Sequence, residues 1–385
     1  MASDDQYSRF RSSAIGQNGR RQSPSQQADG NCGARVSQDG VLVTRRNVVG
    51  AAASVSACGL IADHDNEPLD VDVGATPLRV GLIGCGGRGT VAAAKILDID
   101  QGARIVAMAD QSSTSLAFAS DMLARNHGGR GVCPNKARFS GENGWRGVFD
   151  EHPDLVILAT PAAVRPAQIE TAVANRVHMF VERPLAASLE AVERLQSTVA
   201  NVTKHGLVVV SAMVLRRDQT VQSAVTSLGD PSSESFLAMR GGSSLIVAYP
   251  SPRRVTGGIA RWSVAELVVD AVDVARWVTG DQKVVAVRSS RCDGDDFGPD
   301  IMMELEDGGC IRLVPNRRSR FQAATLDSSR TLSAEGRDPG RWLGAFKQLV
   351  TDVRSGCSRV DAADELSRLL EATRVAILAA DAANA

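Results

Sequence analysis

The sequence has few aromatic residues, no charge excess of either sign and no long apolar run. Phe, Trp and Tyr make up 4% of the 385 residues, which leaves little material for the stacking platforms of proteins that bind single-stranded nucleic acid. The formal net charge of −1 also argues against the basic surface on which nucleic-acid binding depends. We therefore expect no nucleic-acid partner.

The seven cysteines and five histidines are scattered along the chain without a metal-binding or disulfide pattern. No two cysteines form a CxxC pair and there is no HExxH motif, so we predict neither a metal site nor a disulfide framework. No uncharged stretch approaches the ~20 residues that cross a bilayer as a helix, so no membrane span is expected.

The N-terminal segment is first polar and then briefly apolar. Residues 1–40 are rich in Ser, Gln, Gly, Asp and Arg, a composition typical of disorder. Arg45-Arg46 then precede an uncharged stretch, Asn47 to Ala62, which is the layout of a twin-arginine export signal. We expect a leader over residues 1–65 and export to the periplasm or cell envelope. The alternative is an uncleaved tail and a cytoplasmic protein. Cys58 ends a stretch that resembles a lipobox, so lipidation there is a further hypothesis.

A glycine-rich loop stands between a strand pattern and a helix pattern. Residues 78–83 (LRVGLI) are short, apolar and β-branched, and residues 90–97 (TVAAAKIL) favour a helix. A GxGxxG motif in this context is the fingerprint of dinucleotide binding, although a glycine-rich turn without a ligand is the alternative. Its glycines allow a tight turn, a close approach of the backbone to the diphosphate, and tight packing of helix on strand. The predicted diphosphate contacts are Gly84, Cys85, Gly86, Gly87, Arg88 and Gly89.

The strand patterns that follow end in residues suited to hold the rest of a dinucleotide. Asp110 closes a strand about 20 residues past the glycines, where a carboxylate accepts hydrogen bonds from the ribose 2′-OH and repels a 2′-phosphate. This favours NAD, although the Gln and two Ser that follow leave NADP open as the cofactor. Two further strand patterns, 154–161 and 178–182, end at one edge of the predicted sheet. Their end residues, Thr160, Pro161, Glu182 and Arg183, are predicted cofactor contacts.

Strand and helix patterns alternate up to residue 200, and beyond it strand patterns follow one another at hairpin spacing. We predict an α/β fold with an N-terminal Rossmann domain over 77–200, built on a doubly wound parallel sheet. From residue 201 to 340, strand patterns at hairpin spacing predict an α+β domain with an open, largely antiparallel sheet. These patterns include 207–210, 235–239, 284–287, 301–305 and 310–314. The Ala- and Leu-rich end, 341–385, is expected to pack as helices on the body.

Four motifs resemble the Gfo/Idh/MocA family, relatives of glucose–fructose oxidoreductase and inositol 2-dehydrogenase. They are residues 80–89, the Ala-Thr-Pro at 159–161, the Glu-Arg-Pro at 182–184 against the family's Glu-Lys-Pro, and residues 266–280 against the family's acid-xxx-His-xx-Asp followed by Trp and Gly. The resemblance runs from about Leu78 to near the C-terminus. It implies an oxidoreductase that uses NAD or NADP on a sugar-like or polyol substrate, and a second half that often forms the contact of a homo-oligomer.

The chain departs from the family at both positions that the resemblance assigns to the substrate proton. Arg183 stands where Lys is expected, and Asp270 stands where His is expected. Arginine does not deprotonate in proteins, so Arg183 can anchor but cannot shuttle a proton. We predict Asp270 as the base. Glu266 and Asp273 lie on the same helix face, and crowded carboxylates raise a pKa. Arg183, Asp270, Asp273 and Glu266 are thus the predicted catalytic residues.

Other interpretations of these charges stay open. The acids can instead form structural ion pairs with Arg183, Arg216 or Arg217, and the arginines can bind an anionic substrate. Three functions follow. One is hydride transfer between NAD(P) and a sugar-like or polyol substrate. Another is nucleotide binding without dehydrogenase activity, which the changes at 183 and 270 favour. The third is a glycosidase-type reaction in which bound NAD is used transiently.

Overall fold

The computed structural model describes residues 76–213, 215–217, 221–223, 244–250, 264–290, 299–316, 320–325, 331–335, 340–356 and 362–384. All of them belong to the unit formed by Ala57–Ala385. The expected leader over residues 1–65, with its paired arginines and Cys58, lies outside the described residues, as does the strand expected at 235–239. Among the helices that are described, none has the length and apolarity needed to cross a membrane.

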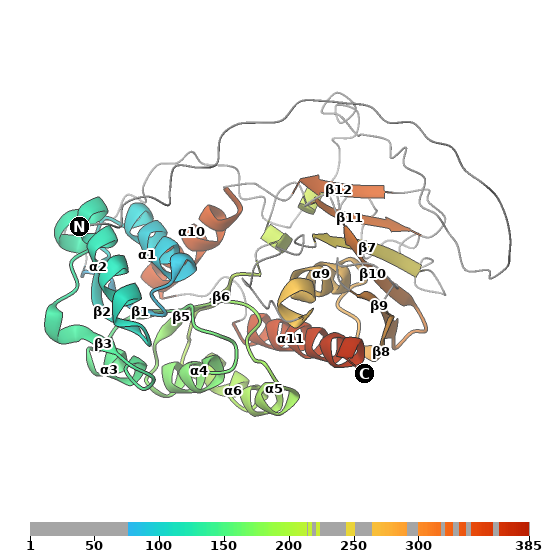
Figure 1. The fold of residues 1–385 in the computed structure, drawn as a ribbon, viewed down its shortest axis with the longest axis horizontal. Helices are drawn as coiled ribbons and strands as arrows, with labels where there is room; N and C mark the ends of the chain where they lie inside the picture. The colour runs from blue at the N-terminus through green and yellow to red at the C-terminus, as the bar shows by residue number, and fades with distance from the viewer. Residues whose placement is uncertain are drawn as a thin grey trace, which may run out of the picture. The chain divides into compact units, whose positions relative to one another are not determined.

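The first half of the chain forms a six-stranded parallel sheet (Figure 1). The strands pair in the order β3-β2-β1-β4-β5-β6, so the strand order reverses between β1 and β4. Their side chains are largely buried, as expected for a parallel sheet covered by helices. The predicted doubly wound sheet is thereby confirmed. The strands are β1 (Arg79–Ile83), β2 (Arg104–Asp110), β3 (Arg138–Ser140), β4 (Leu155–Leu158), β5 (His178–Val181) and β6 (Val209–Ser211).

The last strand of this sheet corrects the sequence-based boundary at residue 200. The run at 207–210 was assigned to the second half of the chain, but β6 pairs in parallel with β5, from Met179 beside Val209 to Val181 beside Ser211. A short apolar run is compatible with either sheet, and only its hydrogen-bonded neighbour decides which sheet it joins. The parallel sheet therefore continues to Ser211.

Two of the helices between these strands begin at a serine whose side chain caps the first turn. Ser112 accepts a hydrogen bond from the Ser115 amide at the start of α2, and Ser188 does the same from the Ala191 amide at the start of α5. The other four helices, α1 among them, have no side-chain cap at the N-terminus. The helices are α1 (Gly87–Ile99), α2 (Ser113–His127), α3 (Trp145–Asp150), α4 (Arg165–Ala174), α5 (Leu189–Gln196) and α6 (Val199–Lys204).

The second half forms another six-stranded sheet, in the order β12-β11-β7-β10-β9-β8. Only β7 and β10 pair in parallel, and the other neighbours are antiparallel, which confirms the predicted open and largely antiparallel sheet. Helix α9 (Val264–Val278) packs on β7 and β10. The strands are β7 (Ser244–Pro250), β8 (Val284–Ser290), β9 (Asp300–Leu305), β10 (Cys310–Asn316), β11 (Arg320–Thr325) and β12 (Thr331–Glu335).

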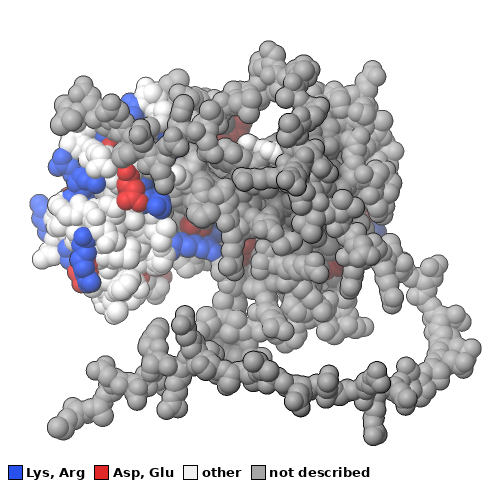
Figure 2. Space-filling view, turned by 90° about the horizontal axis from the view of Figure 1, so that it is seen from above, with Lys and Arg blue, Asp and Glu red and all other residues white. Residues whose placement is uncertain are grey.

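Two C-terminal helices connect this half to the parallel sheet (Figure 1). Helix α10 (Gly340–Ser355) packs on α1, and its Arg354 is paired with the fully buried Asp100 at 2.8 Å. Helix α11 (Ala362–Asn384) lies along α9 and β8 and also contacts α5 and α6. The face in Figure 2 shows basic and acidic side chains dispersed among many uncharged residues in its described part.

Candidate dinucleotide and substrate site

Two glycines of the loop between β1 and α1 are required by the turn itself. Gly84 has a φ of +95°, and a Cβ added to it would lie 2.7 Å from the carbonyl of Ala159. A Cβ added to Gly89 would lie 2.0 Å from the carbonyl oxygen of Gly84, because α1 packs closely on the end of β1. These are the tight-turn and close-packing positions that the glycine spacing predicts.

The glycines between them border open space. A Cβ added to Gly86 or Gly87 would meet no protein atom within 4 Å. Gly86 is the N-cap of α1 and has φ −71° and ψ 178°, which any residue can adopt. Helix α1 has no side-chain cap and no acidic residue in its first turn. Its first amides are therefore available to an anion, and these residues fit the diphosphate of a dinucleotide.

Asp110 lies at the end of β2, next to this loop. Its carboxylate accepts hydrogen bonds from the amides of Cys85 (2.7 Å) and Ser112 (2.8 Å). Each carboxylate oxygen keeps further accepting capacity, so Asp110 can still receive a ribose hydroxyl. The Cys85 amide is occupied by Asp110, and its thiol is buried, which raises the pKa of Cys85. The diphosphate contact predicted for Cys85 does not fit this arrangement.

The loop after β4 is held from the first turns of α4. Thr160 Oγ1 donates to Gln168 Oε1 at 2.6 Å. The guanidinium of Arg165 donates to the carbonyl oxygens of Thr160 and Pro184, and Arg165 is only 3% exposed. Nothing in the sequence pattern marks Arg165, because an arginine at a helix start usually lies in solvent.

The end of β5 reaches the glycine loop through an ion pair. Arg88, in the first turn of α1, donates to Glu182 Oε2 at 3.2 Å. Glu182 is 2% exposed, and its Oε1 is buried without a hydrogen-bond partner. The structure thus brings together three predicted cofactor elements: the glycine loop, the end of β2 and the end of β5.

Helix α9 supplies the predicted base. Arg183 Nη2 lies 2.9 Å from Asp270 Oδ2, and Arg183 Nη1 donates to the backbone carbonyl of Glu266 at 2.9 Å. The side chain of Asp270 is 24% exposed, but its Oδ1 is buried and has no hydrogen-bond partner among the residues that the structure describes. Burial raises the pKa of Asp270, and Arg183 opposes this effect, while Asp273 and Glu182 add to it. Asp270 is therefore ion-paired with Arg183 and also less acidic than usual. Both interpretations of the sequence, a structural ion pair and a base with a raised pKa, apply to it.

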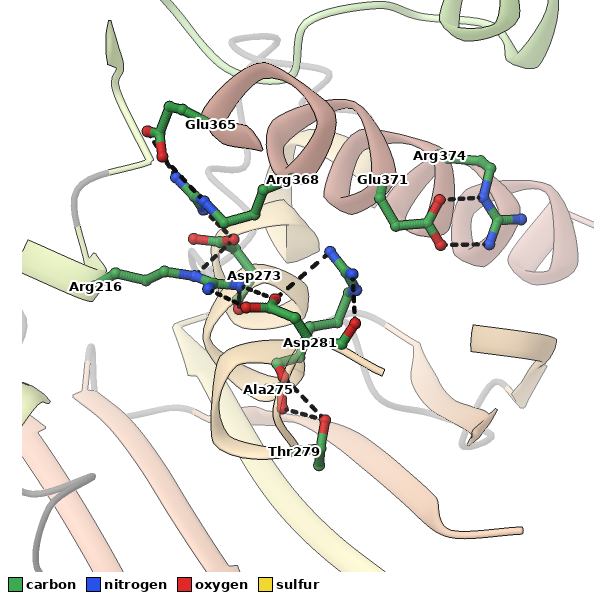
Figure 3. Close-up of polar contacts among 10 residues, drawn as sticks. Arg216, Asp273, Ala275, Thr279, Asp281, Glu365, Arg368, Glu371 and Arg374 are labelled. Atoms are coloured by element: carbon green, nitrogen blue, oxygen red, sulfur yellow. Dashed lines mark hydrogen bonds and ion pairs between the residues drawn. The ribbon is translucent and has the colours of Figure 1, made fainter. Parts of the chain in front are cut away.

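Asp273 has a different environment from that of Asp270 (Figure 3). Its Oδ1 accepts hydrogen bonds from Arg216 Nε, at 3.0 Å, and from Arg368 of α11. Its side chain is 1% exposed. Arg216 also pairs with Asp281 at 2.6 Å, rather than with Asp270 or Glu266. Helix positions three apart point about 60° apart, which is enough to turn Asp273 toward α11 and into a structural ion-pair network.

The described hydrogen bond from Arg183 to Glu266 is accepted by the Glu266 backbone carbonyl, and the catalytic role of the Glu266 side chain stays a prediction. The side chain of Arg217, another predicted ion-pair partner, lies outside the described residues. In the described part of the chain, no three His, Cys, Asp or Glu side chains are grouped as metal ligands.

Residues 78–211 match the model of the GFO_IDH_MocA family, described as an oxidoreductase family with an NAD-binding Rossmann fold. The match spans the parallel sheet from β1 to β6, so this segment is similar to the NAD-binding domains of that family. Two curated relatives, from Shewanella sp. strains ANA-3 and MR-4, are both named Glycosyl hydrolase family 109 protein 2. Each is 31% identical over 170 residues, or 44% of this chain, and the chain spans 34% of the length of these relatives.

Solved structures share the fold across both halves. The scyllo-inositol dehydrogenase of Lactobacillus casei with bound NAD(H) and scyllo-inositol is 16% identical, with a TM-score of 0.61 over 80% of this chain and 97% of that one. The myo-inositol 2-dehydrogenase of Lactobacillus plantarum is 17% identical, with a TM-score of 0.60 over 80% of this chain and 98% of that one. At 16% and 17% identity, these structures are similar to this chain in fold alone.

Proposed function

We propose that the protein is an NAD(P)-dependent oxidoreductase that acts on a sugar-like or polyol substrate by hydride transfer. The observation that carries the proposal is the uncapped N-terminus of α1 beside the open space at Gly86. Asp110 at the end of β2 supports NAD over NADP, because its carboxylate would repel a 2′-phosphate. The similarity in fold to an inositol dehydrogenase with bound NAD(H) and scyllo-inositol supports the substrate class.

Asp270 is the base of this proposal. A bound nicotinamide would accept hydride from the carbon that carries the reacting hydroxyl, which becomes a carbonyl. The hydroxyl proton would pass to Asp270 Oδ1, the oxygen without a partner. Arg183 holds the other oxygen and remains protonated, so it orients Asp270 without taking the proton. The raised pKa makes Asp270 a stronger base than an exposed aspartate.

A screen of sugars and polyols for an absorbance change at about 340 nm, the signal of reduced nicotinamide, tests turnover. With a substrate in hand, Asp270→Asn should lower kcat by about 10²-fold or more, the usual contribution of a general base, and leave NADH affinity unchanged. Unchanged turnover in Asp270→Asn would remove this residue from the mechanism. A protein that binds the cofactor and turns over nothing would favour the alternative of a binding protein without dehydrogenase activity, which the Arg183–Asp270 ion pair supports.

A glycosidase-type reaction is the second candidate, because both curated relatives are named as glycosyl hydrolases. In such a reaction the sugar is oxidised, eliminates its leaving group, adds water in its place and is reduced again, so bound NAD returns to its starting state. Release of nitrophenol from aryl glycosides without net formation of NADH would favour this candidate. Its activity should disappear when the dinucleotide is stripped and return when NAD is added.

Export through a twin-arginine signal is a further part of the proposal, supported by Arg45-Arg46 before the uncharged stretch Asn47–Ala62. Replacing both arginines with Lys should leave the protein in the cytoplasmic fraction. An unchanged distribution between fractions would refute export by this route. Light scattering of the purified protein would test the expected homo-oligomer.

A further inference from the structure

The most unusual buried charge near the site belongs to Arg165, the first residue of α4. Its two terminal nitrogens donate to the carbonyl oxygens of Thr160 and Pro184, and its Nε is buried without a partner. Burial lowers the pKa of Arg165 to about 10, while Glu182 and Glu266 act in the opposite direction, so it remains protonated at neutral pH. A buried cation is costly unless it is well bonded, so this one needs an explanation.

The two carbonyls that Arg165 binds belong to two different loops. Thr160 follows β4, and Pro184 follows β5, the neighbouring strand in the sheet. Gln168, one turn further along α4, receives the hydroxyl of Thr160 at 2.6 Å. One short segment of α4 therefore sets the position of the β4 loop and its distance from the β5 loop.

These two loops lie on one side of the point where the strand order reverses. In this fold a dinucleotide spans the reversal, with one mononucleotide on each half of the sheet. Asp110 at the end of β2 assigns the adenosine half to the β1–β2 side. The nicotinamide half then lies over the ends of β4 and β5. Arg165 bonds to both of those ends, and its two described hydrogen bonds include none to the β1–β2 side.

The β5 loop also carries the charge pair with α9. Pro184 directly follows Arg183, whose guanidinium contacts Asp270 and the carbonyl of Glu266. A shift of the Pro184 carbonyl would therefore move Arg183 and the base that it orients. A single planar guanidinium spans both carbonyls, whereas the ammonium of a Lys side chain is a compact point charge.

We propose that Arg165 is a positioning residue for the nicotinamide half of the bound dinucleotide. It holds the β4 and β5 loops at the spacing that the nicotinamide ring requires. The inference rests on the proposed cofactor binding. It predicts that loss of Arg165 weakens binding of NADH and spares ADP-ribose, which has the same adenosine and diphosphate but lacks the nicotinamide.

The test is a titration of the wild type, Arg165→Met and Arg165→Lys with NADH and with ADP-ribose. Arg165→Met keeps an unbranched side chain that reaches about as far as the Arg Nε and loses every donor, so NADH affinity should fall by about tenfold or more, while ADP-ribose affinity stays within about twofold. Arg165→Lys should show the same selectivity to a smaller extent. Gly86→Ala is the control, because it should weaken both ligands.

Equal weakening of both ligands in Arg165→Met would show a general structural role and overturn the proposal, as would unchanged binding of both. If Arg165→Met does not fold, Arg165→Lys decides, and wild-type affinity for NADH in that variant overturns the proposal. A folded wild type that binds neither ligand refutes the proposed function itself, and this outcome is distinct from the others.

Discussion

A turn can require glycine because the protein's own backbone leaves no room for a side chain or because a bound ligand does. Replacing Gly86 with Ala distinguishes these two reasons. At Gly84 and Gly89 the protein's own backbone excludes a side chain, since an added Cβ would lie 2.7 Å and 2.0 Å from its neighbours. At Gly86 an added Cβ meets nothing within 4 Å, and the backbone conformation suits any residue. If glycine is required at 86, a ligand must require it.

The expected change in folding stability is small because two effects oppose each other. Gly→Ala at a compatible backbone position stabilises by ~0.4–1 kcal/mol through the unfolded state. Alanine is a poorer N-cap than glycine, which costs a comparable amount of ~0.5–1 kcal/mol. The net change in the free energy of unfolding should stay within about 1 kcal/mol. By contrast, a methyl group between the amides of α1 and the diphosphate should lower dinucleotide affinity by at least tenfold, about 1.4 kcal/mol.

Urea unfolding measures the free energy of unfolding of Gly86→Ala, and a fluorescence titration with NADH measures its dinucleotide affinity. Gly344→Ala is the matched control, because Gly344 lies within α10 and an added Cβ there also meets nothing within 4 Å. It should stabilise the fold by about 1 kcal/mol, the difference in helix propensity, and leave NADH affinity unchanged. Full NADH affinity in Gly86→Ala, or a loss of more than about 2 kcal/mol of stability, would refute the reasoning.

Three further predictions follow from the same site. Gly89→Ala should destabilise the fold by about 3 kcal/mol, because its Cβ would overlap the Gly84 carbonyl, and a wild-type urea midpoint would contradict this. Asp110→Asn should shift the ratio of NADP to NAD affinity toward NADP by about tenfold, and an unchanged ratio in paired titrations would leave Asp110 without a part in cofactor choice. The raised pKa of Asp270 means that the folded state holds this proton more tightly than the unfolded state, whose value is 3.8. Ionisation of Asp270 therefore lowers the free energy of unfolding as pH rises from 3.8 through the folded-state pKa. The decrease in the free energy of unfolding with pH should be smaller in Asp270→Asn when unfolding is measured across that range.

The parts of the fold that depend on local patterns were predictable from the sequence. The conformation of the glycine loop is determined by backbone sterics within a few residues. Gly84 and Gly89 have the tight-turn and close-packing geometry that the spacing of the glycines implies. The strand at Val209–Ser211 shows where such patterns stop. Its apolar run predicts a strand, but its partner β5 is set by long-range packing, so it was assigned to the wrong sheet.

The candidate site shows the same limit. Helix periodicity places Glu266, Asp270 and Asp273 on one face, but it does not reveal their partners. Asp273 bonds to arginines 57 and 95 residues away in sequence, so these partners are visible only in the folded chain. The sequence pattern does not mark Arg165 for a related reason, because burial of an arginine is a property of the tertiary structure.

Isothermal titration of the purified, folded protein with NADH and NAD, followed by competition with ADP-ribose, tests the central claim most directly. We predict saturable binding of one dinucleotide per chain, displaced by ADP-ribose, because both ligands place the same diphosphate at the amides of α1. A folded protein that binds neither NAD nor NADP, in oxidised or reduced form, would contradict the account.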